Sequence, residues 1–211
     1  MTNTVSTPQL IEWMQMFRDR IVHEKDYLTE LDARVGDADH GSNMVRGVNA
    51  VVSRLDENPP ANVTEFCNTV GMTLVSTVGG AAGPLYGTFF MRAGTAAQGA
   101  ETLTGPELRD VLAAGVQGVQ SRGKAQRGDK TMFDVLSAAL AAVETVKDLP
   151  IVESVQHAVD GAKAELEKSR DLIAQKGRAS YFGEKSRGQV DPGSASSVML
   201  FESLVAALTK A

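Results

Sequence analysis

Apolar residues recur every three or four positions along most of the chain, the spacing that puts them on one face of an α-helix. The first such face, residues 10–21, follows Thr7 and Pro8, which suit a helix start because a hydroxyl caps it and proline fits its first position. Asn62 and Thr104 each precede a glutamate by three positions, as in a capping box. We therefore expect helices that begin at residue 7 and then cover residues 26–34, 42–57, 62–78, 84–99, 104–120, 131–146, 150–176 and 194–210.

The pattern contains no segment with the alternation of apolar and polar residues that marks a strand. Aromatic residues make up only 5% of the chain, whereas alanine, leucine and valine are plentiful, and this composition favours closely packed helices over a β-sandwich. Eight or nine helices with short connections predict an all-α fold, either a bundle or a barrel. The length of 211 residues suits a single domain over residues 1–211.

Four of the predicted loops are rich in glycine, aspartate, arginine and lysine. They cover residues 36–43, 79–83, 121–130 and 177–193. In an array of helices that run up and down, alternate loops lie at the same end. We therefore expect these four loops to meet at one rim of the fold.

Charge and composition exclude several classes of function. The formal charge of −5 argues against a broad nucleic-acid-binding surface, which needs clustered lysine and arginine. Cys67, the single cysteine, cannot form an internal disulfide and fits a reducing compartment. The first residues lack the basic and apolar regions of a signal peptide, and the longest apolar run, residues 135–143, is far shorter than the roughly 20 residues that span a bilayer. We expect a cytoplasmic protein that binds neither nucleic acid nor membrane.

The loop at residues 36–43 carries the strongest candidate chemistry. Asp37 and Asp39 lie two positions apart, and Asp32 precedes them near the end of a predicted helix. Isolated pairs of this kind are often solvated turn residues. Three neighbouring carboxylates repel each other, however, and beside a helix start they suit Mg²⁺ that carries phosphate. Two Mg²⁺ ions, about +4, come nearer than one to balancing three aspartates and ADP, roughly −6. His40 could bond a phosphate or orient an aspartate.

The other three loops each allow a structural and a nucleotide-binding interpretation. Residues 79–83 are either a tight helix–helix turn or a loop whose backbone N–H groups face a phosphate, although they form no Walker A motif. Residues 121–130 are a flexible cationic loop, beside which Met132 offers an apolar wall for a purine. Arg178 carries a guanidinium that matches phosphate oxygens. Residues 191–193 either belong to the same site or form a turn before the last helix.

Taken together, these loops closely resemble the nucleotide-binding L subunit of dihydroxyacetone kinase, of the type that depends on the phosphotransferase system. The resemblance rests on four motifs in the same order, spread over residues 27–197. They read GDADHGSNM, GMTLVSTVGGAAGPLYGTFF, SRGKAQRGDKTM and KGRASYFGEKSRGQVDPGSAS. The resemblance implies a barrel of eight antiparallel amphipathic helices with the nucleotide site at one end.

The resemblance also assigns roles to residues of this chain. It implies that Asp32, Asp37 and Asp39 hold two Mg²⁺ ions, which bridge the phosphates of ADP or ATP. Arg178 is implied as the catalytic residue and as part of the loop that covers the nucleotide. The further nucleotide-binding positions that it implies are His40, Gly41, Ser42, Asn43, Ala81, Ala82, Gly123, Met132, Asp191, Pro192 and Gly193.

The implied activity needs partner subunits. In this family a K subunit holds dihydroxyacetone covalently through a histidine, and the L subunit transfers a phosphoryl group to it from its nucleotide. An M subunit of the phosphotransferase system rephosphorylates the bound ADP. Two alternatives remain open: a kinase subunit that uses free ATP for another small sugar, and a nucleotide-state sensor that binds a transcriptional regulator. A homodimer is also compatible with the family.

Overall fold

The computed structural model describes residues 4–210, which form helices joined by loops and one small sheet. The sheet pairs β1 (Thr4–Ser6) with β2 (Thr102–Thr104) in antiparallel register. The all-α prediction is confirmed, but the expectation of no strand is wrong, because three-residue strands are too short to show alternation. The helices are α1 (Thr7–His23), α2 (Lys25–Val35), α3 (His40–Glu57), α4 (Val63–Thr77), α5 (Ala82–Ala97), α6 (Gly105–Gly123), α7 (Met132–Glu144), α8 (Ile151–Ser169), the 3₁₀ helix η1 (Arg178–Ser186) and α9 (Pro192–Lys210).

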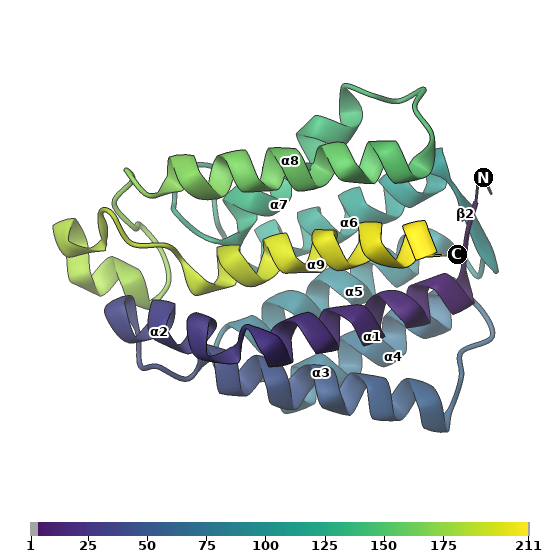
Figure 1. Ribbon diagram of the computed structural model, residues 1–211, viewed down its shortest axis with the longest axis horizontal. Helices are drawn as coiled ribbons and strands as arrows, with labels where there is room; N and C mark the ends of the chain where they lie inside the picture. Colours follow the sequence, from purple (N-terminus) through teal and green to yellow (C-terminus); the bar gives the residue numbers. More distant parts are fainter. Residues whose placement is uncertain (1–3, 211) are drawn as a thin grey trace.

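The long helices pack around one apolar core (Figure 1). Helix α1 contacts α3 and α9, and from α3 to α9 each α-helix contacts the next one along the chain, so the contacts return to α1. Trp13 lies in the core between Phe66 and Phe90, with ring centroids 6.5 and 5.6 Å away, and its Nε1 donates a hydrogen bond to Leu200 O at 2.8 Å. The core thus fixes α1, α4, α5 and α9 relative to each other.

Helices α4 and α5 approach each other especially closely. A Cβ atom on Gly71 would lie 2.8 Å from Gly87 O, which is nearer than real Cβ contacts come. Only glycine allows this separation of the two backbones. The turn that joins these two helices lies against α3, since a Cβ on Gly79 would lie 2.9 Å from Asn43 Nδ2.

Several element boundaries differ from the predicted ones for local reasons. The cap of α1 is Ser6, whose N–H donates to Gln9 Oε1 at 2.9 Å, whereas the Thr7 hydroxyl donates to Glu101 O at 3.0 Å. Helices α3 and α5 begin two residues earlier than predicted. Helix α8 ends at Ser169 and does not reach residue 176, because carbonyl oxygens beyond it accept hydrogen bonds from Lys130.

The four loops rich in glycine and charge gather at one end of the molecule, as predicted. In Figure 1 this is the end at α2, while β1, β2 and both labelled termini lie at the opposite end. Residues from all four loops line one cavity. Within the part of the chain that the structure describes, no helix has the length and apolar character needed to cross a membrane.

Candidate functional site

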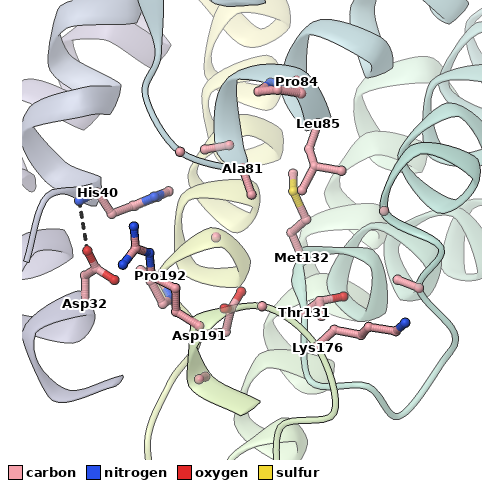
Figure 2. A pocket seen from close by; sticks show the side chains of 18 of the residues that line it. Asp32, His40, Ala81, Pro84, Leu85, Thr131, Met132, Lys176, Asp191 and Pro192 are labelled. Carbon is pink, nitrogen blue, oxygen red and sulfur yellow. Dashed lines mark hydrogen bonds between the residues drawn. The ribbon is translucent and has the colours of Figure 1, made fainter. Parts of the chain in front are cut away.

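The cavity at the loop end has a volume of about 490 Å³. Figure 2 shows Asp32 and His40 on one side, Leu85 and Met132 on the other, and Asp191 nearby. The walls therefore change from charged to apolar across the cavity. Of the predicted site residues, only Gly41 and Ser42 do not line the cavity. Those that do are Asp32, Asp37, Asp39, His40, Asn43, Ala81, Ala82, Gly123, Met132, Arg178, Asp191, Pro192 and Gly193.

The acidic side is built by the end of α2 and the turn that follows it. Asp32 lies in the last turn of α2 and is buried, and Asp37 and Asp39 follow in the turn. Asp32 Oδ2 accepts hydrogen bonds from the backbone N–H groups of Asp39 at 2.8 Å and His40 at 3.1 Å. One carboxylate oxygen of each aspartate lies within 4.8 Å of the others. The turn thus converges on Asp32, and the three acids form one cluster.

This cluster fits a divalent metal ion. Carboxylate oxygens are the ligands that Mg²⁺ prefers, and like charges held so close need a cation nearby. One positive charge comes from the protein itself, because Arg178 Nη2 lies 2.8 Å from Asp37 Oδ2. A glycine provides the room for the cluster: a Cβ on Gly36 would lie 2.0 Å from Asp32 Oδ1.

His40 is part of a buried polar network behind the acidic cluster. Its Nε2 lies 3.0 Å from Ser196 Oγ on α9, and the Tyr86 hydroxyl lies 2.7 Å from Ser196 Oγ and 3.1 Å from Ser197 Oγ. Burial lowers the pKa of His40 to about 4, although Asp32 raises it, so the ring is neutral at pH 7. The backbone N–H of His40 orients an aspartate, as one of the two predicted roles requires, while its ring Nε2 faces α9.

Asp191 is both a helix cap and a part of the cavity wall, so the two interpretations of residues 191–193 hold together. Its Oδ2 accepts hydrogen bonds from Ser194 N at 2.7 Å and Ser194 Oγ at 3.0 Å, at the start of α9. Burial raises the pKa of Asp191 to about 6, against these two hydrogen bonds, which lower it. The negative charges of Asp134 and Asp32 raise it further. Placing this carboxylate in the wall therefore disfavours its ionised form.

The glycine-rich turn brings the N-terminal end of α5 to the cavity. Gly80 has a φ of +65°, and Ala81 and Ala82 follow at the start of the helix. Gly79 packs on the amide of Asn43, since a Cβ there would lie 2.9 Å from both amide heteroatoms. The first N–H groups of a helix lack intrahelical acceptors and carry partial positive charge. This turn is thus both a helix connection and a surface suited to phosphate.

The apolar side and the segment over the cavity complete the site. Met132 begins α7 and is 4% exposed, and it faces the cavity beside Leu85 and Gly123. We name residues 170–191, which connect α8 to α9 and contain η1, the cover segment. It brings residues 176–179, including Arg178, to the cavity. The site therefore offers an apolar wall, a helix start and an acidic cluster around one cavity.

A family model described as the DAK2 domain matches residues 34–206. The chain belongs to the DAK2 domain family. It is 42% identical over 195 residues to "PEP-dependent dihydroxyacetone kinase 1, ADP-binding subunit DhaL" of Listeria innocua, covering 92% of this chain and 93% of the relative. It is 41% identical over 209 residues to the corresponding Escherichia coli subunit, covering 98% and 99%. A rat triokinase/FMN cyclase is 30% identical over 98% of this chain and 36% of the relative.

Solved structures agree with this membership. The dihydroxyacetone kinase of C. freundii in complex with AMP-PNP and Mg²⁺ superimposes with a TM-score of 0.73 and 27% sequence identity. The match covers 93% of this chain and 33% of that one, so this DAK2 domain spans about a third of the larger kinase. The chain is thus similar in sequence to subunits named as ADP-binding and similar in fold to a kinase solved with a nucleotide analogue.

Sequence reasoning missed several residues that line the DAK2 cavity. Leu85, Thr131 and Lys176 all face it, and none was singled out. Leu85 and Thr131 adjoin predicted positions at helix starts, so a search of whole helix starts would have found them. Lys176 was predicted as the end of a helix, although it is also the first residue of the fourth motif, KGRASYFGEKSRGQVDPGSAS, which could have pointed to it.

Proposed function

We propose that this chain is the nucleotide-binding subunit of a phosphoenolpyruvate-dependent dihydroxyacetone kinase. The observation that carries the proposal is the joint arrangement of an acidic cluster and the N-terminal end of α5 around one cavity of about 490 Å³. Support comes from the full-length similarity to subunits of that name. The chain binds ADP or ATP and passes a phosphoryl group to dihydroxyacetone on a K subunit.

The acidic cluster is the metal site of this proposal. Asp32, Asp37 and Asp39 would hold two Mg²⁺ ions, because a single ion leaves three carboxylates and a diphosphate over-anionic. Such ions, when bound, neutralise phosphate oxygens and so favour phosphoryl transfer. The chain's own part is positional: two backbone N–H groups aim the Asp32 carboxylate, and the turn holds the other two beside it.

The remaining site residues divide between the two ends of the nucleotide. The start of α3, His40 to Asn43, and the start of α5 at Ala81 and Ala82 lie at the phosphate end, where the first N–H groups of α5 lack intrahelical acceptors and suit a phosphate. Gly123 and Met132 border the base and the ribose, and residues 191–193 close the wall between. Arg178 is the catalytic residue, since its guanidinium forms an ion pair with Asp37 of the acidic cluster.

The proposal extends to partners and to architecture. A K subunit supplies the acceptor, and an M subunit of the phosphotransferase system rephosphorylates bound ADP in the cytoplasm. The succession of contacts that returns from α9 to α1 supports a barrel of eight helices, with α2 added at the nucleotide end. Two further proposals are that this chain acts as a nucleotide-state sensor that binds a transcriptional regulator, and that it forms a homodimer; both leave the nucleotide site unchanged.

Native mass spectrometry of the purified protein tests the proposal before any nucleotide is added. A mass excess of ADP or ATP with two Mg²⁺ is expected. The matched variants are Asp37→Ala in the cluster and Asp148→Ala, an exposed acid far along the chain between α7 and α8. We expect Asp37→Ala to lose the metal and phosphoryl transfer with its helix content intact, and Asp148→Ala to keep both. Full turnover by Asp37→Ala with a K subunit would refute the metal assignment.

A kinase subunit that exchanges free ATP is the second candidate, favoured by the similarity to triokinase/FMN cyclase. The same spectra separate the two. Protein that arrives without nucleotide and binds Mg–ATP reversibly supports direct use of ATP. Protein that binds neither nucleotide contradicts both candidates.

A further inference from the structure

Lys130 is a buried cation that the nucleotide site does not use directly. It lies just before α7, is 2% exposed and has a backbone φ of +62°. Lysine is rarely buried, and a side chain other than glycine is strained at this φ. The turn is held in place by Asp134, whose carboxylate accepts a hydrogen bond from Thr131 N at 2.7 Å. A lysine in such a position indicates that its side chain makes a specific contribution.

The Lys130 ammonium group binds three carbonyl oxygens of the cover segment. Its Nζ donates to Arg170 O at 3.1 Å, Leu172 O at 2.9 Å and Ser186 O at 2.6 Å. A protonated lysine has three N–H donors, so donors and acceptors match in number. Two acceptors lie where α8 has ended and the third lies at the end of η1. One side chain therefore ties both ends of the cover segment to the start of α7.

Apolar packing holds the cover segment only weakly. Within residues 170–191, all of which the structure describes, the buried apolar side chains are Ala174, Ala179 and Val190. The two alanines form a small cluster with Val35 that is separate from the main core. Two alanine methyl groups bury little area, and Val190, which packs in the main core, holds only the last residues of the segment, so apolar burial contributes little to the attachment of residues 170–189. Polar ties such as those of Lys130 must supply most of the attachment.

The residues at the two ends of this tie line the same cavity. Thr131 and Met132 follow Lys130 directly, and Lys176 and Arg178 lie within the segment that its ammonium group holds. All four line the cavity, and Figure 2 labels Thr131, Met132 and Lys176. We propose that Lys130 is a positioning residue, which fixes the cover segment over the cavity and thereby slows nucleotide release. That the released ligand is a nucleotide rests on the proposed function, whereas the attachment of the cover segment by Lys130 does not.

Lys130→Met tests the proposal, because methionine keeps most of the apolar stem and removes the three donors. The matched control is Lys185→Met, an exposed lysine on the same segment. Hydrogen exchange followed by mass spectrometry reads the segment without any nucleotide. We expect amides of residues 170–190 to exchange about tenfold faster in Lys130→Met, with α1 and α3–α6 unchanged. Dissociation of a fluorescent ADP analogue with Mg²⁺ should also rise about tenfold, with association changed much less. Lys185→Met should match the wild type.

The outcomes distinguish the role of Lys130 from the proposed nucleotide-binding function. Unchanged exchange in the segment, or exchange that rises equally throughout the chain, would overturn the proposal. Wild-type protein that binds no ADP analogue contradicts the proposed function, while the exchange data still decide whether Lys130 holds the segment. If Lys130→Met does not fold, nitrogen-15 NMR of the wild type decides instead. A slowly exchanging lysine ammonium signal with couplings to backbone carbonyl carbons is expected, and its absence would overturn the proposal.

Discussion

Gly36→Ala should damage the acidic cluster without touching any of its carboxylates. A Cβ at Gly36 would lie 2.0 Å from Asp32 Oδ1 and 2.9 Å from Asp32 Cγ, well inside van der Waals contact. The φ of Gly36 is −153°, which lies outside the left-handed region, so the clash with Asp32 is what an added methyl group introduces. Either the Asp32 carboxylate or the turn must move by about 1 Å or more.

The size of the effect follows from what Asp32 holds. Movement of its carboxylate breaks or lengthens the hydrogen bonds from Asp39 N and His40 N, now 2.8 and 3.1 Å. Hydrogen bonds to charged groups are each worth about 1.5–3 kcal/mol, so the loss is about 3–6 kcal/mol. If half of the lower figure appears in ligand binding, the affinity for Mg–ADP falls about tenfold, and if all of it appears, more than 100-fold.

Isothermal titration calorimetry with Mg–ADP measures this loss, and circular dichroism reports the helices. The control is Gly99→Ala, since Gly99 has a φ of +81° and nothing within 4 Å of an added Cβ. Alanine at this left-handed position, between α5 and β2, costs about 1 kcal/mol of backbone strain. Binding by Gly36→Ala within twofold of the wild type would falsify the reasoning, because the carboxylate would then tolerate displacement.

The remaining predictions concern three other side chains. Arg178→Ala should slow single-turnover transfer more than it speeds nucleotide release, because its guanidinium reaches the acidic cluster; equal effects on both rates would contradict a catalytic role. Burial raises the pKa of Cys67 to about 12, so a thiol reagent at pH 8 should label it only as the protein unfolds, and rapid labelling of folded protein would contradict its place in the core. The folded pKa of Asp191, about 6, exceeds its unfolded value, so its contribution to stability is complete below pH about 4 and is lost as pH rises through 6. Urea unfolding of Asp191→Asn should show a flatter decline over that interval, and an unchanged pH slope would count against the raised pKa.

Most of the fold could be predicted because helical periodicity is local. Every long helix was expected near its place, and Asn62 caps α4 through Glu65 N at 2.9 Å, as its spacing predicted. The β1–β2 pair could not be predicted, since three residues carry too little pattern. The early end of α8 was also hidden: apolar residues continue to Ala174, but the carbonyl groups there bind Lys130, which lies 40 and 42 positions earlier in the chain.

The site was predictable as far as its chemistry sits in short motifs. The acidic cluster, the turn before α5 and Arg178 each combine glycine or charge in ways that local sequence reveals. The network of His40, Tyr86 and Ser196 does not, because its members lie on α3, α5 and α9 and are joined only by packing. A serine on a helix normally predicts an exposed position, yet the serines at positions 194, 196 and 197 are buried. Long-range polar contacts are therefore the part that the sequence conceals.

The two attachments that the cover segment makes through charged side chains, those of Lys130 and Arg178, differ greatly in strength. The pair of Arg178 and Asp37 is exposed, with side-chain exposures of 61% and 38%, so it contributes at most about 1 kcal/mol and weakens with salt. The Lys130 side chain is buried, with one of its three hydrogen bonds buried and two partly buried, and bonds from a charged donor contribute about 1.5–3 kcal/mol each. The segment is thus fastened beside α7, at the apolar end of the cavity, and held loosely over the acidic cluster. In the proposed kinase subunit, that asymmetry would hold the nucleotide at its base and leave the terminal phosphate open to a partner subunit.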